Sequence, residues 1–308
     1  MDKLFGTDGI RAVAGEFPLD PGSVVSLGRA LAGLLRAGAP TPRVLIGRDT
    51  RESGAWLEAA LAGGFRAGGG HPVSAGVIPT SAVSLLTQRH GFAAGVVISA
   101  SHNPFRDNGI KIFSAAGVKI ADDWEDELEA AVRRGPGAVS VEPLVLEAEP
   151  AYLQDYLSYL GSRFSRKERR EKLRLVLDCA NGAAAGVAPV LFRSLGFEVT
   201  SLHAEPDGQN INRECGSLHP EGLGRAVREA GADFGMAYDG DADRAVWADE
   251  TGLVLNGDHT LYVQALHLQE TGRLRGGVVV ATTMSNMGLE KALAARGLEL
   301  VRTRVGDK

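Results

Sequence analysis

The 308-residue sequence lacks the features that mark two large classes of binding protein. It has no long basic run and a formal net charge of −5, whereas nucleic-acid-binding surfaces are usually basic, so we expect no nucleic-acid partner. No apolar run approaches the roughly 18 residues that a membrane-spanning helix needs, and the first residues contain no apolar signal core. We therefore expect a cytoplasmic protein with no membrane partner.

Cysteine and nucleotide-binding signatures are scarce or missing as well. The two cysteines, Cys179 and Cys215, are far apart and have no metal-ligand spacing, which is typical of thiols in or near the core in a reducing compartment. The sequence contains neither GxxxxGK[ST] nor a GxGxxG coupled to a strand. Glycine is abundant instead: 40 residues, well above the usual ~7%, which indicates many tight turns and sites lined by backbone.

One pattern recurs along the chain: a buried strand, a polar loop and then a helix, which is the building block of α/β folds. It opens at Val44, Leu173 and Val278, too far apart for a solenoid, and so predicts tandem three-layer α/β/α domains. The expected division is domain I with a serine-bearing loop, domain II with a carboxylate-bearing loop and the start of domain III, over 1–150, 151–255 and 256–308. Because the third pattern stops in a loop, we expect a C-terminal portion to be missing.

The stretch GVVISASHNPFRDNGIKIF, at 95–113, joins two apolar runs that predict strands through one polar loop. An Asn-Pro pair and an Asn-Gly pair constrain the path of this loop. Ser101 and His102 therefore project from a stiff loop, and Lys111 follows a short way downstream. A hydroxyl beside an imidazole suggests a serine that attacks or carries a group, although a Ser-His pair alone also fits an ordinary polar turn.

A second loop carries three alternating carboxylates, Asp239, Asp241 and Asp243, between two apolar runs. On an extended or looped backbone these side chains can converge, and their repulsion predicts a hard cation, Mg²⁺ or Ca²⁺. An EF-hand fits less well, because Arg244 occupies its sixth position, which needs glycine, although Glu250 falls at position twelve. A solvated acidic turn without an ion is the remaining alternative.

The N-terminal turn FGTDGIR, at 5–11, brings glycine backbone and the Arg11 guanidinium together. This is a candidate anion site, although an ordinary Asp-Gly hairpin turn fits it equally well. A serine on a rigid loop, a three-aspartate metal loop and arginines in glycine-rich turns together suggest phosphoryl transfer through a phosphoserine.

With both loops in place, the sequence resembles the α-D-phosphohexomutase superfamily. The hallmarks of that superfamily are the Ser-His-Asn-Pro loop, here at 101–104, and the DGDxDR loop, here at 239–244. Within the superfamily the chain is similar to the bacterial phosphoglucosamine mutase family. The stretches that carry this similarity are FGTDGIRA at 5–12, GRDTRESG at 47–54, DNGIKIF at 107–113, DCANGA at 178–183, NINRECGSLH at 210–219, MSNMGLE at 284–290 and RTRVGD at 302–307.

The resemblance implies an isomerase that interconverts glucosamine 6-phosphate and glucosamine 1-phosphate, on the route to UDP-N-acetylglucosamine and cell-wall precursors. Glucosamine 1,6-bisphosphate would be the intermediate. Ser101 would carry the phosphate, and one Mg²⁺ per chain would be bound by the phosphoserine oxygen and by the three aspartates, Asp239, Asp241 and Asp243. The resemblance also implies a possible homodimer.

Other roles are implied less closely. His102 and Lys111 are candidate proton handlers, Arg11 and Arg244 are candidate phosphate contacts, and the identity of the general base stays open. Ser99 is a rival for Ser101, but it lies nearer the strand end and lacks the Ser-His-Asn-Pro match.

The resemblance also implies a fourth domain, which we expect to be absent together with the sugar-contacting loop of the third domain. Little turnover is therefore expected of residues 1–308 alone. The alternatives are a phosphoglucomutase or phosphomannomutase, and a non-catalytic relative that binds sugar phosphates.

Overall fold

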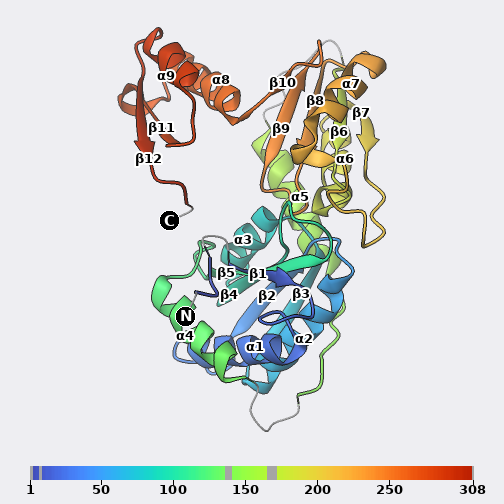
Figure 1. The fold of residues 1–308 in the computed structure, drawn as a ribbon, viewed down its shortest axis with the longest axis vertical. Coiled ribbons are helices and arrows are strands. Elements are labelled where there is room, and N and C mark those ends of the chain that lie inside the picture. Colours follow the sequence, from blue (N-terminus) through green and yellow to red (C-terminus); the bar gives the residue numbers. More distant parts are fainter. Residues whose placement is uncertain (1–2, 7–8, 136–140, 165–171, 307–308) are drawn as a thin grey trace.

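The structure, a computed structural model, describes residues 3–6, 9–135, 141–164 and 172–306. Residues 7–8 of the predicted anion turn and 307–308 at the end of the expected domain III lie outside this part. Three β-sheets follow one another along the chain, and we call each sheet with its helices the first, second and third unit (Figure 1). No helix of the described part is long and apolar enough to cross a membrane.

The first unit contains a five-stranded sheet in the order β1-β5-β4-β2-β3. Strands β2, β3 and β4 are parallel, whereas β5 pairs antiparallel with both β4 and β1. The strands are β1 (Ile10–Val13), β2 (Arg43–Arg48), β3 (His71–Val77), β4 (Ala94–Ile98) and β5 (Asp107–Ser114). The helices beside this sheet are α1 (Pro21–Leu35), α2 (Ser53–Ala67), α3 (Thr80–Arg89), α4 (Asp122–Arg134) and α5 (Pro150–Arg163).

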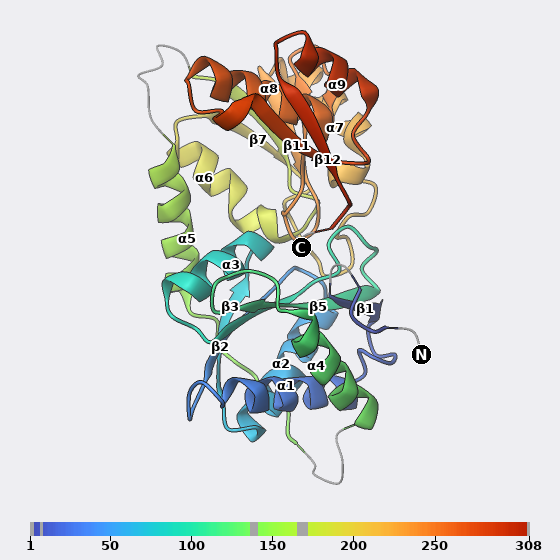
Figure 2. The same ribbon diagram turned by 90° about the vertical axis from the view of Figure 1, so that its left-hand side faces the viewer.

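Alternating apolar residues give the first sheet two buried faces, since successive side chains of a strand point to opposite sides. Val44 and Ile46 of β2 pack in the cluster formed with α1, α2 and α4, whereas Leu45 packs on the opposite side with α3. Figure 2 shows this layering, with α1, α2 and α4 on one side of the sheet and α3 on the other. Tyr152 and Tyr156 of α5 are buried in the α3 layer, so the predicted three-layer sandwich is confirmed.

The second unit repeats the arrangement with a sheet in the order β10-β9-β8-β6-β7. Its strands are β6 (Arg174–Asp178), β7 (Glu198–Leu202), β8 (Phe234–Tyr238), β9 (Ala245–Asp249) and β10 (Val254–Leu255). Its helical elements are η1 (Ala183–Gly186), α6 (Ala188–Ser194), η2 (Gly216–Leu218) and α7 (Pro220–Ala230). Leu175 and Leu177 of β6 pack on the α6 side, and Val176 packs on the α7 side with Leu223 and Val227.

The third unit has two parallel strands, β11 (Val278–Thr282) and β12 (Glu299–Thr303). Helices α8 (Gly257–Glu270) and α9 (Met287–Ala294) begin after the asparagine caps Asn256 and Asn286, and η3 (Arg275–Gly277) precedes β11. Leu289 and Leu293 of α9 pack with Ala265 of α8 in one cluster.

The loops that matter for function all follow the carboxyl ends of strands. The loop after β2 and the loop after β4 lie at one edge of the first sheet, and the loop after β8 lies at the corresponding edge of the second. In open α/β sheets ligands bind outside the carboxyl ends of the strands.

The predicted N-terminal turn differs from expectation in one respect: its last residues form β1, which pairs with β5 and so places Arg11 beside the strand that carries Lys111.

Candidate active site

The predicted serine loop connects β4 to β5 and carries Ser101 near its start. Its backbone is left-handed, with φ of 52°, and its side chain is buried, at 1% exposure. The Ser99 hydroxyl accepts a hydrogen bond from the Ser101 backbone N–H at 2.9 Å and donates one to Asp49 Oδ2 at 2.5 Å. Ser99 therefore supports the loop from beneath, while the Ser101 hydroxyl projects toward the second unit.

The carboxylate loop lies between β8 and β9, which pair antiparallel, so the helices that an EF-hand needs are absent at these flanks. Ala242 is left-handed, with φ of 58°, and its backbone N–H closes a turn onto the Asp239 carbonyl. The three aspartates converge through this turn rather than through simple alternation along a strand. Their carboxylate oxygens come within 4.8 Å of one another, with Asp239 and Asp241 buried and Asp243 exposed.

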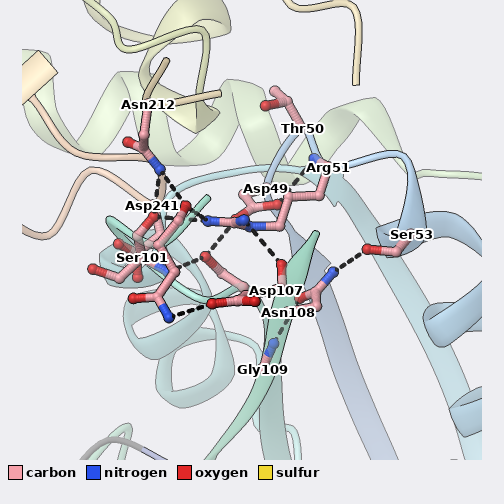
Figure 3. A network of polar contacts seen from close by, with 12 residues as sticks. Asp49, Thr50, Arg51, Ser53, Ser101, Asp107, Asn108, Gly109, Asn212 and Asp241 are labelled. Carbon is pink, nitrogen blue, oxygen red and sulfur yellow. Dashed lines mark hydrogen bonds and ion pairs between the residues drawn. The ribbon is translucent and has the colours of Figure 1, made fainter. Parts of the chain in front are cut away.

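The two loops meet at hydrogen-bond distance. The Ser101 hydroxyl donates to Asp239 Oδ2 at 2.5 Å, and Thr80, at the start of α3, donates to Asp241 Oδ2 at 2.5 Å. The Thr80 backbone N–H also donates to the Asp241 carbonyl at 3.1 Å. Figure 3 labels Ser101 and Asp241 within the surrounding network of polar contacts. The Ser101 hydroxyl of the first unit thus forms a hydrogen bond to the three-aspartate cluster of the second unit.

The charges in this cluster oppose one another. Burial and the Asp243 charge raise the pKa of Asp239, which the Ser101 hydrogen bond partly offsets. Burial and the Asp239 charge raise the pKa of Asp241 to about 7, against the opposing influence of Thr80 and Lys111. A cation bound nearby would stabilise the ionised forms of Asp239 and Asp241 and so lower the raised pKa values of both carboxyls.

The donor set fits a hard divalent cation. Three carboxylates supply oxygen ligands, and Asp241 Oδ1 is buried without a hydrogen-bond partner in the described part of the chain. An unpaired buried carboxylate oxygen costs free energy, and coordination to a metal ion would satisfy it. Oxygen-only ligation of this kind selects Mg²⁺ or Ca²⁺ over softer metals.

A cavity of about 680 Å³ opens beside the carboxylates and is lined by basic side chains. Arg11 of β1, Lys111 of β5 and Arg244 all face it, together with Asp243. Lys111 Nζ lies 3.6 Å from Asp243 Oδ2 and Arg244 Nε lies 3.8 Å from Asp243 Oδ1. A cavity with this charge is suited to a phosphorylated ligand.

The remaining predicted residue, His102, is half-buried, and its Nδ1 lies 3.3 Å from Ser101 Oγ. The structure thus gathers all of the residues that the sequence singled out. The sequence analysis did not single out several further residues, most of which hold the serine loop or the carboxylate loop in position. These residues are Asp49, Arg51, Thr80, Asn212 and Gly240. Asp49 and Arg51 lie in GRDTRESG and Asn212 lies in NINRECGSLH, two of the stretches that resemble the family. A resemblance over a stretch does not show which atoms its residues contact.

A second group of metal-ligating side chains, Asp178, His203 and Cys215, also lies within 4.8 Å in the second unit. Here both Asp178 oxygens already accept backbone hydrogen bonds, from Ala180 and Gly216, at 2.9 Å each. Burial and the Asp178 charge raise the pKa of Cys215 to about 12, which disfavours a thiolate. This group stabilises the loops of the second unit, and the buried thiols Cys179 and Cys215 are core residues as predicted.

Three family models match in succession, described as phosphoglucomutase/phosphomannomutase α/β/α domains I, II and III. They match residues 2–136, 154–252 and 256–308.

Individual relatives agree with the family models. The chain is 49% identical to a phosphoglucosamine mutase of Moorella thermoacetica and 46% identical to one of Koribacter versatilis, each match covering 100% of the chain. It spans 70% and 69% of those two relatives. A crystal structure of a phosphoglucomutase/phosphomannomutase family protein from Burkholderia thailandensis matches 99% of the chain with a TM-score of 0.82 and 27% identity. The chain covers 66% of that structure.

Proposed function

The chain belongs to the phosphoglucomutase/phosphomannomutase family of α-D-phosphohexomutases, and we propose that it interconverts glucosamine 6-phosphate and glucosamine 1-phosphate through a phosphoserine at Ser101. One observation carries this proposal: the Ser101 hydroxyl lies 2.5 Å from Asp239 within a three-carboxylate group, beside a cavity lined by Arg11, Lys111 and Arg244. The relatives named phosphoglucosamine mutase support the choice of sugar.

The reaction requires two phosphoryl transfers. In the first, the free anomeric hydroxyl of glucosamine 6-phosphate attacks phosphorus on phospho-Ser101, the Ser101 O–P bond breaks and a sugar 1,6-bisphosphate results. In the second, Ser101 Oγ attacks the phosphorus at the other end of the reoriented bisphosphate, and the sugar oxygen leaves with a proton. The proton lost by the sugar hydroxyl in the first transfer is regained in the second, so the cycle balances.

This chain's own residues supply positioning and charge. His102 Nδ1 lies 3.3 Å from Ser101 Oγ, within reach to give a proton to the serine oxygen as its bond to phosphorus breaks and to take that proton back in the second transfer. Lys111, Arg11 and Arg244 supply positive charge to the cavity in which the transferring phosphate is bound. Mg²⁺ held by the three aspartates and the Ser101 oxygen would neutralise charge on the phosphoryl oxygens.

We expect the full-length protein to favour glucosamine 6-phosphate over glucose and mannose 6-phosphates by on the order of 10²-fold in kcat/KM. A site that pairs with a substrate amino group leaves that partner unmatched when a hydroxyl takes its place. Parallel assays of the three sugar phosphates, each primed with its own 1,6-bisphosphate, measure this ratio. Preference for glucose or mannose phosphate would instead assign the chain to the phosphoglucomutase or phosphomannomutase reaction.

A further inference from the structure

Arg51 holds the serine loop from within the first unit. Its side chain is fully buried, and its Nε donates to Asp49 Oδ2 at 2.9 Å, so its charge is paired inside the protein. The two terminal nitrogens then donate to four backbone carbonyls of the loop, those of Ser101, Asn103, Pro104 and Asp107. The planar fork of guanidinium donors suits this task, because it fixes several acceptors in one geometry.

Asn212 reaches two of the same carbonyls from the second unit. Its Nδ2 donates to the Ser101 carbonyl at 2.9 Å and to the Asn103 carbonyl at 3.1 Å (Figure 3). The backbone of Asn212 is left-handed, with φ of 58°, and its N–H donates to the Ala180 carbonyl at 2.9 Å. The amide is therefore fixed relative to the loop after β6 rather than carried on a free side chain.

The carboxylate loop packs against the same point. A Cβ at Gly240 would lie 2.6 Å from the Ser101 carbonyl oxygen and 2.9 Å from Asn212 Nδ2. Any residue other than glycine at this position would therefore displace the Ser101 carbonyl or the Asn212 amide. The Ser101 carbonyl thus accepts hydrogen bonds from both Arg51 and Asn212, and it lies close against Gly240 of the carboxylate loop. A displacement of this carbonyl also moves the Ser101 hydroxyl relative to Asp239.

We propose that Asn212 is a positioning residue for phosphoryl transfer, which together with Arg51 clamps the Ser101 loop across the boundary between the first two units. The inference rests on the proposed function, because it assigns Asn212 an effect on the chemistry at Ser101. The Asn212 amide touches no reacting atom. It acts by fixing the backbone carbonyl of Ser101, the residue whose hydroxyl carries the phosphate. Misplacement of a reacting group by about 1 Å can cost on the order of 10²-fold in rate.

Other hydrogen bonds across the same boundary provide a control, since they do not contact the serine loop. The Thr50 hydroxyl donates to the Asn181 carbonyl at 2.5 Å, and Gln209 donates to Glu52 at 2.8 Å. Thr50→Val removes one bond between the units and keeps the shape of the side chain. If Asn212 only joined the units, its loss and the loss of the Thr50 hydroxyl would have similar consequences.

The experiment compares wild-type full-length protein with the variants Asn212→Gly, Asn212→Asp and Thr50→Val. Glycine adopts positive φ without strain, so Asn212→Gly removes the amide alone. Asn212→Asp retains size and tolerance of the left-handed backbone but replaces the donor by an acceptor. Dephosphorylated proteins are mixed with glucosamine 1,6-bisphosphate and Mg²⁺, well below their melting temperatures, and phosphate on Ser101 is followed by rapid quench and mass spectrometry.

We expect both Asn212 variants to transfer phosphate about 10-fold or more slowly at saturating bisphosphate, with half-saturation changed less than about 3-fold. Thr50→Val should stay within about 2-fold of wild type in both quantities. Transfer at the wild-type rate in Asn212→Gly and Asn212→Asp, or an equal loss in Thr50→Val, would overturn the positioning role while leaving the proposed function intact. Failure of wild-type Ser101 to acquire phosphate would overturn both.

Discussion

Replacing Ser101 with alanine is expected to lower mutase turnover on the order of 10⁴-fold or more, because the phosphate then has no oxygen to occupy between its two transfers. The change should leave the fold intact. It removes one hydroxyl with its hydrogen bond to Asp239 and its contact with His102, a loss of about 1–2 kcal/mol, and no part of the buried apolar clusters of the first unit. Steady-state turnover of glucosamine 6-phosphate, with circular dichroism to confirm folding, measures the effect.

Two companion variants separate the hydroxyl from its surroundings. Ser101→Gly also lacks the hydroxyl but relieves the positive φ of 52°, so it should be as inactive as Ser101→Ala if the hydroxyl is what matters. Ser99→Ala removes the hydrogen bonds to Asp49 and to the Ser101 N–H and should cost only about 10-fold. A larger loss in Ser99→Ala than in Ser101→Ala would make Ser99 the phosphate carrier and refute the assignment.

Asp241→Asn is expected to move stability and activity in opposite directions. The raised pKa of about 7 means that the folded state of the metal-free protein is penalised once Asp241 ionises. Between the unfolded pKa near 4 and this value the native state binds more protons, so that stability falls as pH rises. A neutral amide escapes this penalty, and the metal-free variant should be more stable than wild type at pH 8 by on the order of 1 kcal/mol or more. Turnover should fall on the order of 10²-fold or more, because one metal ligand is lost.

Thermal unfolding in EDTA and in Mg²⁺, at pH 6 and pH 8, tests this expectation. In wild type the stabilisation by Mg²⁺ should be larger at pH 8, since protons no longer compete for the carboxylates. In Asp241→Asn it should be small at both pH values. Asp249→Asn is a matched control, because hydrogen bonds from Thr251 and Leu253 lower the pKa of that exposed carboxyl and the variant should gain no stability. Lower stability of metal-free Asp241→Asn than of wild type at pH 8 would contradict the account.

Sequence patterns predicted the elements whose signal is local. The strands β2 and β4 were expected because β-branched and apolar runs end abruptly in polar loops. The strand β1 was not expected, since only one of its four residues, Ile10, is buried and the segment becomes a strand by pairing with β5. Helix α7 was overlooked although Pro220 at its first turn and the left-handed Gly231 at its end are recognisable boundary signals.

The site residues also differ in whether a local sequence signal identifies them. Ser101 and the three aspartates could be found because they occur in short motifs whose residue types indicate their chemistry. Thr80 could not, because its partner Asp241 lies 161 positions away and a threonine at a helix start is ordinarily a cap. Arg51 and Asn212 also act through backbone carbonyls, which every residue has, so no pattern of side chains in the sequence identifies their targets.

The most direct test of the central claim is the intact mass of the protein purified without phosphatase treatment, followed by peptide mapping of the stretch from Ile98 to Lys111. The account predicts one phosphate, localised to Ser101, that is lost during turnover and never present in Ser101→Ala. Full-length protein that carries no phosphate on Ser101, and acquires none from glucosamine 1,6-bisphosphate in the presence of Mg²⁺, would contradict the phosphoserine mechanism and favour a sugar-phosphate-binding protein without catalysis.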